Sequence, residues 1–223
     1  MSSNNNKVWL VGASDMAIDY FKVLKDLKVE VIVIGRGKDS AKNFYLKTGF
    51  APIEGGVKDF LKKNPNKCDF AIIAAGIEEL SSITNDILNY GIKNILVEKP
   101  SGLNINQISL INKNSMNNNA NVYVAYNRRF YASTLKAKEI IRNDGGVTSF
   151  NFEFTEWADI IEPLQKNKII KENWFLANSS HIADLAFYLG GFPKEIKTYV
   201  SGSLSWHKSA SIFSGAGITN EGA

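Results

Sequence analysis

The stretch "NILVEKPSG", residues 94–102, joins a short apolar run to a charged pair and a proline. Residues 95–97 are apolar at consecutive positions, which is typical of a strand buried on both faces of a sheet. Glu98 and Lys99 follow where such a strand ends, and Pro100 stiffens the exit and biases Lys99 towards an extended conformation. The stretch therefore predicts a core strand that ends on an ammonium group.

Similar apolar runs occur on both sides of this stretch. They lie at residues 8–12, 31–35, 70–76 and 122–127, and segments of helical period lie between the runs at 18–27, 80–91 and 105–113. Alternating strands and helices of this kind predict a doubly wound parallel sheet with right-handed crossovers. We therefore expect an α/β fold whose N-terminal domain, residues 1–125, is of the Rossmann type.

The pattern changes after Tyr126. Phenylalanines alternate with polar residues over 147–157, which is the period of a strand that is apolar on one face only. The other predicted elements are helices at about 131–143 and 179–191 and a last strand at 195–206. Ser179 is suited to cap the second helix. Residues 126–223 are thus expected to form a C-terminal α+β domain on an open, mostly antiparallel sheet.

Composition limits the classes of function. Of the 223 residues, 44% are hydrophobic and 22% charged, and the net charge of +4 comes from lysines spread along the chain, so no nucleic-acid-binding surface is indicated. Cys68 is the single cysteine, which excludes an internal disulfide and fits a reducing compartment. No apolar run approaches the roughly 18 residues of a membrane span. We expect a cytoplasmic protein without membrane partners, and the scarcity of histidine and cysteine predicts no metal site.

The first apolar run leads into "GASDMA", residues 12–17. Gly12, Ser14 and Ala17 stand where a dinucleotide-binding turn has G-x-G-x-x-G/A. Ser14 replaces the glycine that lets the backbone approach a pyrophosphate, although its hydroxyl could donate a hydrogen bond instead. Asp15 favours the helix dipole but repels a phosphate. Taken alone, the motif fits a plain strand-to-helix turn equally well.

Arg36 lies after the second apolar run, about 20 residues beyond the glycine turn. A dinucleotide with a free ribose 2'-hydroxyl calls for an acid at this distance, whereas a 2'-phosphate calls for an arginine. The sequence here reads Gly35, Arg36, with Lys38 close behind. This favours NADP over NAD as the cofactor, with NAD as the alternative. A solvated basic loop is the competing interpretation.

Lys99 has a similar pair of interpretations. Ligands of doubly wound sheets lie beyond the carboxyl ends of the strands, so Lys99 is expected to point into the cofactor crevice. Its ammonium could stabilise charge on a reacting oxygen, with Glu98 orienting it. A lone lysine at a strand end is otherwise a solvated surface residue.

Three motifs in order along the chain resemble those of one family. "VEKP" (97–100), "YNRRF" (126–130) and "NSSHIADLAFYLGG" (178–191) are similar to segments of the Gfo/Idh/MocA family, named after glucose-fructose oxidoreductase and inositol dehydrogenase. The resemblance implies an NAD(P)-dependent oxidoreductase that transfers a hydride between nicotinamide and a sugar, nucleotide sugar or related polyol. It also implies a homo-oligomer that associates through the C-terminal sheet.

The resemblance assigns roles to individual residues. Lys99 and His181 are the implied catalytic residues. Together with the turn and strand ends described above, the expected cofactor-binding residues are Gly12, Ser14, Asp15, Met16, Arg36, Ala75, Gly76, Glu98 and Lys99. The substrate-binding residues that the resemblance implies are Tyr126, Asn127, Arg129 and Asp184. A histidine in the first turn of a helix can act as a proton carrier, and its competing interpretation is a packed histidine satisfied by neighbours.

Two positions and the length depart from the family pattern. Ala177 stands where many members have an aspartate, and Leu80 stands where a histidine follows the third apolar run. Members generally continue for about another hundred residues, so either a fragment or a natural short variant is expected. These departures keep open a non-catalytic relative that binds NAD(P) as a sensor or assembly subunit, and a Rossmann-like protein that binds another nucleotide.

Overall fold

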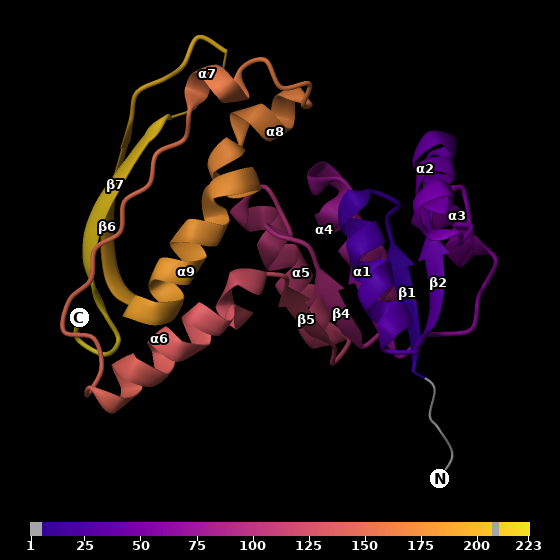
Figure 1. The fold of residues 1–223 in the computed structure, drawn as a ribbon, viewed down its shortest axis with the longest axis horizontal. Coiled ribbons are helices and arrows are strands. Elements are labelled where there is room, and N and C mark those ends of the chain that lie inside the picture. Colours follow the sequence, from indigo (N-terminus) through magenta and orange to yellow (C-terminus); the bar gives the residue numbers. More distant parts are fainter. Residues whose placement is uncertain (1–5, 207–209) are drawn as a thin grey trace. The chain divides into compact units, whose positions relative to one another are not determined.

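The computed structural model describes residues 6–206 and 210–223, which form two compact units (Figure 1). The first unit ends at Ala125 and the second begins at Tyr126. The first unit is a sheet covered by helices. The second contains helices and a two-stranded ribbon. That the first unit binds the dinucleotide and the second the substrate stays a prediction.

The sheet of the first unit has five parallel strands, as the apolar runs predicted. They are β1 (Lys7–Val11), β2 (Glu30–Ile34), β3 (Phe70–Ile73), β4 (Asn94–Val97) and β5 (Asn121–Val124), in the order β2-β1-β3-β4-β5. Ile53 adds a single parallel bridge beside Ile34 on the outer side of β2. The strands therefore follow one another outward from β1 to β2 on one side and from β3 through β4 to β5 on the other. A crevice is expected at the carboxyl ends of β1 and β3, where the direction changes.

Helices cover both faces of this sheet. They are α1 (Asp15–Asp26), α2 (Lys38–Thr48), α3 (Gly56–Lys62), the 3-10 turn η1 (Ile77–Glu79), α4 (Leu80–Tyr90) and α5 (Ile105–Asn117). Alternate residues of β1 point to opposite faces, since Leu10 packs with Phe21 and Phe44 of α1 and α2, whereas Trp9 packs with Phe60 and Leu80 of α3 and α4. Burial on both faces explains why the strands read as continuous apolar runs.

Particular residues end and begin these helices. Gly91 ends α4 in the left-handed conformation (φ +97°), which glycine adopts more readily than other residues. The Asn104 side chain accepts a hydrogen bond from the Gln107 backbone N–H at 3.0 Å and caps α5. The Gln107 side chain in turn accepts one from the Leu103 N–H at 2.7 Å, so two N–H groups near the helix start are satisfied.

Trp9 occupies the centre of the α3/α4 side of the core. Its side chain is fully buried, and its ring lies 4.9 Å from that of Phe60 and 5.7 Å from that of Tyr90. The contact with Phe60 is edge-to-face, the geometry that aromatic rings prefer. This cluster fixes α3 and α4 against the middle of the sheet.

The second unit is mainly helical. Its elements are η2 (Asn127–Phe130), α6 (Ala132–Asn143), α7 (Ala158–Ile161), α8 (Lys168–Glu172), the π turn η3 (Phe175–Ser179), α9 (Ser180–Gly190), β6 (Pro193–Ser201) and β7 (Ile212–Thr219). The strands β6 and β7 form an antiparallel ribbon, and α9 contacts α6 and η2. Figure 1 shows α6 and α9 side by side.

The strand expected at 147–157 does not form, and this prediction is wrong. The segment has no regular structure, and within the described residues β6 and β7 pair only with each other. The alternating phenylalanines nevertheless share one packing side, because Phe150 and Phe152 lie 6.0 and 5.7 Å from the Phe187 ring of α9. Alternation thus reports side-chain packing, while a strand also needs a hydrogen-bonded neighbour. The described antiparallel sheet is consequently a two-stranded ribbon.

The start of α9 also differs from the prediction. Ser179 does not cap the helix, because the π turn η3 continues the helical path before Ser180. The Ser179 hydroxyl instead donates a hydrogen bond to Glu156 Oε1 at 2.6 Å. His181 therefore lies within a longer helical segment and not in the first turn of a free helix end.

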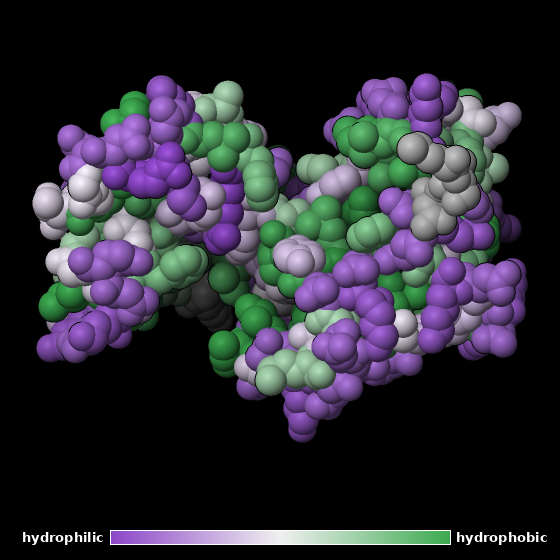
Figure 2. All heavy atoms as spheres, turned by 90° about the horizontal axis from the view of Figure 1, so that it is seen from below, coloured by the Kyte–Doolittle hydropathy of each residue, from purple (hydrophilic) through white to green (hydrophobic). Residues whose placement is uncertain are grey.

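The surface mixes side chains of both kinds. Hydrophilic and hydrophobic residues are interspersed over the face drawn in Figure 2. Over the described ranges, 6–206 and 210–223, no helix combines the length and apolar character that crossing a membrane requires.

Candidate functional site

Gly12 follows β1 at the centre of the predicted crevice. Its φ of +124° is a conformation that favours glycine, and an added Cβ would collide with the backbone carbonyl of Ala74 at the end of β3. The Ala74 N–H donates to the Val11 carbonyl at 2.7 Å, and the Gly12 N–H donates to the Ile34 carbonyl at 2.9 Å. The ends of three strands therefore meet at a position that only glycine fits.

The next residues of the turn have partners within the protein. The Ser14 hydroxyl donates to the Ala74 carbonyl at 3.2 Å, so it braces the turn. Lys47 of α2 forms an ion pair with Asp15 at 2.7 Å, and this contact lowers the pKa of Asp15. Because Lys47 compensates the carboxylate, the repulsion of a phosphate expected from Asp15 is weakened. Met16 is 46% exposed beside them.

Arg36 lines a pocket at the carboxyl ends of β1 and β2. The pocket has a volume of about 250 Å³. Its lining includes Gly12, Arg36, Gly55, Gly56, Lys58, Ala75, Glu79, Ser82 and Asp86. Arg36 Nη1 forms an ion pair with Glu79 Oε1. Glu79 is not among the predicted site residues, because it lies in η1 after β3, whereas Arg36 is recognised by its place after β2. The predicted Gly76 is exposed and does not line this pocket.

Glu98 and Lys99 follow β4, as predicted. The Glu98 backbone N–H donates to the Ile73 carbonyl at 2.9 Å, and its carboxylate accepts a hydrogen bond from the Tyr20 hydroxyl of α1 at 2.7 Å. Burial, together with the Glu98 carboxylate, raises the pKa of Tyr20. The Lys99–Pro100 peptide bond is cis. Tyr20, which the sequence reasoning did not single out, thus anchors the carboxylate that was expected to orient Lys99.

In the second unit, the predicted substrate residues Arg129 and Asp184 bind each other. Arg129 Nε donates to Asp184 Oδ2 at 2.8 Å, and Nη2 pairs with Oδ1. The Asp184 side chain is only 9% exposed. Hydrogen bonding to Asp184 raises the pKa of Arg129. The bidentate pair joins η2 to α9 and occupies donors that were predicted to contact substrate.

Tyr126 and His181 meet beside this ion pair. Their ring centroids are 5.7 Å apart at an interplanar angle of 85°. The Arg129 guanidinium lies 5.7 Å from the Tyr126 ring centroid and 4.9 Å from that of Tyr188. Burial raises the pKa of Tyr126. The structure therefore brings Tyr126, Arg129, His181 and Asp184 into one cluster, while Asn127 begins η2 with an exposed side chain.

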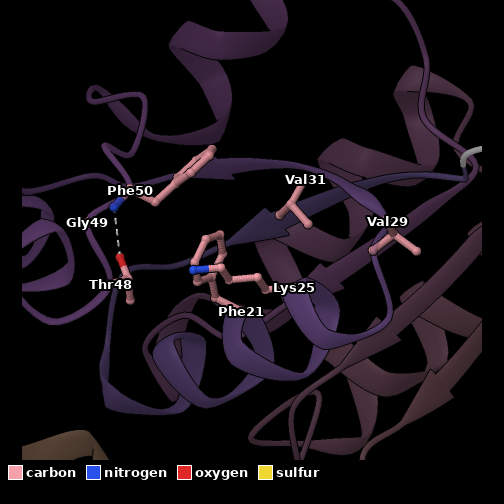
Figure 3. Close-up of a pocket in the computed structure, with 7 residues that line it drawn as sticks. All are labelled: Phe21, Lys25, Val29, Val31, Thr48, Gly49 and Phe50. Carbon is pink, nitrogen blue, oxygen red and sulfur yellow. Dashed lines mark hydrogen bonds between the residues drawn. The ribbon is translucent and has the colours of Figure 1, made fainter.

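A second pocket lies away from these residues. It has a volume of about 280 Å³, and its lining consists of Phe21, Lys25, Val29, Val31, Thr48, Gly49 and Phe50 (Figure 3). Val29 and Val31 lie at the amino end of β2, opposite the edge of the sheet where doubly wound folds bind ligands. None of the predicted site residues lines it. Nor do the described residues contain a group of three His, Cys, Asp or Glu side chains that could hold a metal ion.

Comparisons with solved structures identify similar folds. The WlbA dehydrogenase from Chromobacterium violaceum, in complex with NADH and UDP-GlcNAcA, matches with a TM-score of 0.78 and 16% identity over 100% of this chain and 66% of that chain. WlbA from Bordetella pertussis, with the same ligands, matches with a TM-score of 0.78, 14% identity and the same two coverages. An oxidoreductase from Agrobacterium radiobacter, in complex with NAD+, L-tartaric acid and magnesium, has a TM-score of 0.74 and 13% identity over 99% of this chain and 65% of that chain.

The likeness concerns the fold and part of the length. This chain spans 65% to 66% of these three proteins. No family model and no curated protein matches the sequence. At these identities a common architecture is shown, and it extends over both units of the chain.

Proposed function

We propose that this chain, whose fold is that of the Gfo/Idh/MocA-type oxidoreductases, belongs to an NAD(P)-dependent enzyme that acts on a sugar or nucleotide sugar. The reaction would transfer a hydride between the nicotinamide and a carbon of the substrate. A nucleotide sugar is favoured because the WlbA structures contain UDP-GlcNAcA. The single cysteine fits action in the cytoplasm.

The observation that carries the proposal is the glycine turn at the switch point of the sheet. Gly12 excludes a Cβ against Ala74 and lies between the carboxyl ends of β1, β2 and β3. This is the place where doubly wound folds bind a dinucleotide. Compensation of Asp15 by Lys47 fits the approach of a pyrophosphate to the start of α1.

The roles of the other residues follow from their chemistry. A bound dinucleotide supplies the hydride acceptor or donor. Gly12, Ser14 and Ala75 would hold it, and the Lys99 ammonium would stabilise charge on the reacting oxygen of the substrate. His181 would exchange the proton of that oxygen, with Tyr126 packed against its ring. The Arg129–Asp184 pair would keep η2 and α9 in place for this cluster.

The proposal is tested by binding and then by turnover. A shift of the melting temperature with NADH, NAD+, NADPH or NADP+ at millimolar concentration is expected, and no shift with any of them would refute the proposal. Dehydrogenase assays on nucleotide sugars should then show that Lys99→Ala and His181→Ala lose turnover far more than cofactor affinity. Activity equal to that of the unmodified chain in both variants would refute the assigned roles.

A non-catalytic relative is the second candidate. Leu80 is completely buried in the core and Ala177 is 4% exposed, so neither position offers the polar group that many family members have there. Such a protein would bind the dinucleotide as a sensor or assembly subunit. Cofactor binding without turnover on a panel of nucleotide sugars and polyols would select this candidate over the first.

Self-association through the C-terminal ribbon completes the proposal. Tyr199, Ile212 and Ile218 are each more than half exposed, and the pairing register places them on one face of the ribbon. Exposed apolar side chains on one face of a ribbon are suited to an interface between copies. Light scattering should give a mass of at least two chains, and Tyr199→Lys should lower it. A monomer at micromolar concentration would refute this part.

A further inference from the structure

The Arg36–Glu79 ion pair determines what the pocket at the ends of β1 and β2 can receive. Arg36 arrives two residues after β2, and Glu79 arrives from the turn η1 on the far side of β1. The Arg36 side chain is 71% exposed, whereas that of Glu79 is 33% exposed. The carboxylate is thus the more enclosed partner, and it holds a guanidinium that would otherwise be available to an anion.

The formal charges of the pocket lining cancel. Arg36 and Lys58 contribute two positive charges, and Glu79 and Asp86 contribute two negative charges. A ribose 2'-phosphate carries about −1.5 to −2 charges at pH 7. To bind it, Arg36 would have to share its guanidinium between the phosphate and the Glu79 carboxylate, so the two anions would lie side by side. The pocket is therefore poorly suited to a 2'-phosphate.

The free ribose 2'-hydroxyl of NAD, in contrast, is bound by a negatively charged side chain. It donates a hydrogen bond to a carboxylate, which is why dinucleotide-binding folds that use NAD place an acid near the ribose. Here Glu79 supplies a carboxylate inside the pocket although the end of β2 carries Arg36. The acid thus comes from a different loop, after β3, than the one in which sequence reasoning looks for it.

We propose that Glu79 is the specificity-determining residue of this pocket and makes it select NAD(H) over NADP(H). The inference rests on the proposed function, because it concerns the same dinucleotide. It reverses the preference that Arg36 alone predicts. Arg36 positions the Glu79 carboxylate by pairing with it and serves as a phosphate ligand only when that carboxylate is absent.

The test is calorimetric titration of the full chain with NADH and NADPH at one fixed ionic strength, since the extra charges of NADPH make its binding salt-sensitive. The unmodified chain should bind NADH at least ten times more tightly than NADPH. Glu79→Gln keeps the size of the side chain but removes its charge and releases Arg36. In this variant the affinity ratio should move at least tenfold towards NADPH.

Two further variants test whether the affinity ratio depends on the Glu79 carboxylate itself or only on the net charge near the pocket. Glu78→Gln removes the same charge from an exposed neighbour that does not line the pocket, and the ratio should stay unchanged. Arg36→Ala combined with Glu79→Gln should lose the gained NADPH affinity. Circular dichroism spectra identify any variant that does not fold.

The outcomes distinguish this inference from the proposed function. If NADH and NADPH both fail to bind the unmodified chain, the proposed function falls and the inference falls with it. If the chain prefers NADPH, only the inference is overturned, and this result does not depend on any variant. The same holds if Glu79→Gln and Glu78→Gln change the ratio equally.

Discussion

Breaking the Arg129–Asp184 pair should reveal how strongly it stabilises the second unit. Arg129→Ala leaves the Asp184 carboxylate, 9% exposed, without its bidentate partner and also removes the stacking on Tyr126 and Tyr188. Removing one partner of a buried pair costs about 3–5 kcal/mol, and we expect about 3 kcal/mol because Arg129 itself keeps contact with water. Asp184→Asn leaves the 30% exposed guanidinium beside a neutral group and should cost less, about 2 kcal/mol.

The assay is a double-mutant cycle on the free energy of unfolding, measured by urea denaturation with far-UV circular dichroism. The double variant should cost less than the sum of the single variants by at least about 1 kcal/mol, the coupling expected of contacting charges. Glu139→Gln, which breaks the exposed ion pair with Lys136 on α6, is the matched control and should change stability by less than about 0.5 kcal/mol. Additivity of Arg129→Ala and Asp184→Asn would refute the reasoning.

Three other results are expected. Gly12→Ala should lower the free energy of unfolding by about 1–3 kcal/mol or more, because the added Cβ meets the Ala74 carbonyl. The control Gly49→Ala, whose added Cβ would meet no atom at φ +72°, should be less destabilising in thermal denaturation. Burial raises the pKa of Cys68 to about 12, so the free energy of unfolding should fall as the pH rises above 9, where the unfolded thiol ionises. Iodoacetamide should also alkylate the native thiol far more slowly than the unfolded one, and equal alkylation rates would contradict the burial. Asn104→Ala should cost about 1 kcal/mol in chemical denaturation through loss of the α5 cap, and an unchanged midpoint would show that the cap is dispensable.

The first unit could be predicted closely from the sequence because its strands are buried on both faces. Such strands are recognised as runs of consecutive apolar residues. The end of α4 is recognised at Gly91, because a helix commonly ends on a residue in the left-handed conformation, which favours glycine. The position of Lys99 at the end of β4 follows from the same pattern. These signals are local, so one sequence contains them.

The second unit was predicted less well because its structure depends on contacts between distant residues. The phenylalanines of 147–157 alternate as in a strand, yet Phe150 and Phe152 pack on Phe187 of α9 and Phe154 packs on Phe175. β7 was missed because its glycines weaken the strand pattern, although Gly217 allows close approach to the Glu195 carbonyl of β6. No sequence spacing signals that Ser179 bonds Glu156 instead of capping α9.

The candidate site shows the same division. Gly12 and Arg36 could be found from their distance along the chain, but their partners could not. Glu79 reaches Arg36 across 43 positions, and Tyr20 reaches Glu98 across 78. Each partner changes what the predicted residue can bind, because Glu79 pairs with the Arg36 guanidinium and the Tyr20 hydroxyl donates a hydrogen bond to the Glu98 carboxylate.

Trp9 is buried and is the one tryptophan of the first unit, so its fluorescence can report on the folding of that unit. The other indoles all belong to the second unit, at Trp157, Trp174 and Trp206. Replacing those three with phenylalanine would leave one emitter, packed against Phe60 and Tyr90 and shielded from iodide until the surrounding sheet opens. Its emission maximum, followed in parallel with the ellipticity of the whole chain, would show whether the two units melt together or in sequence.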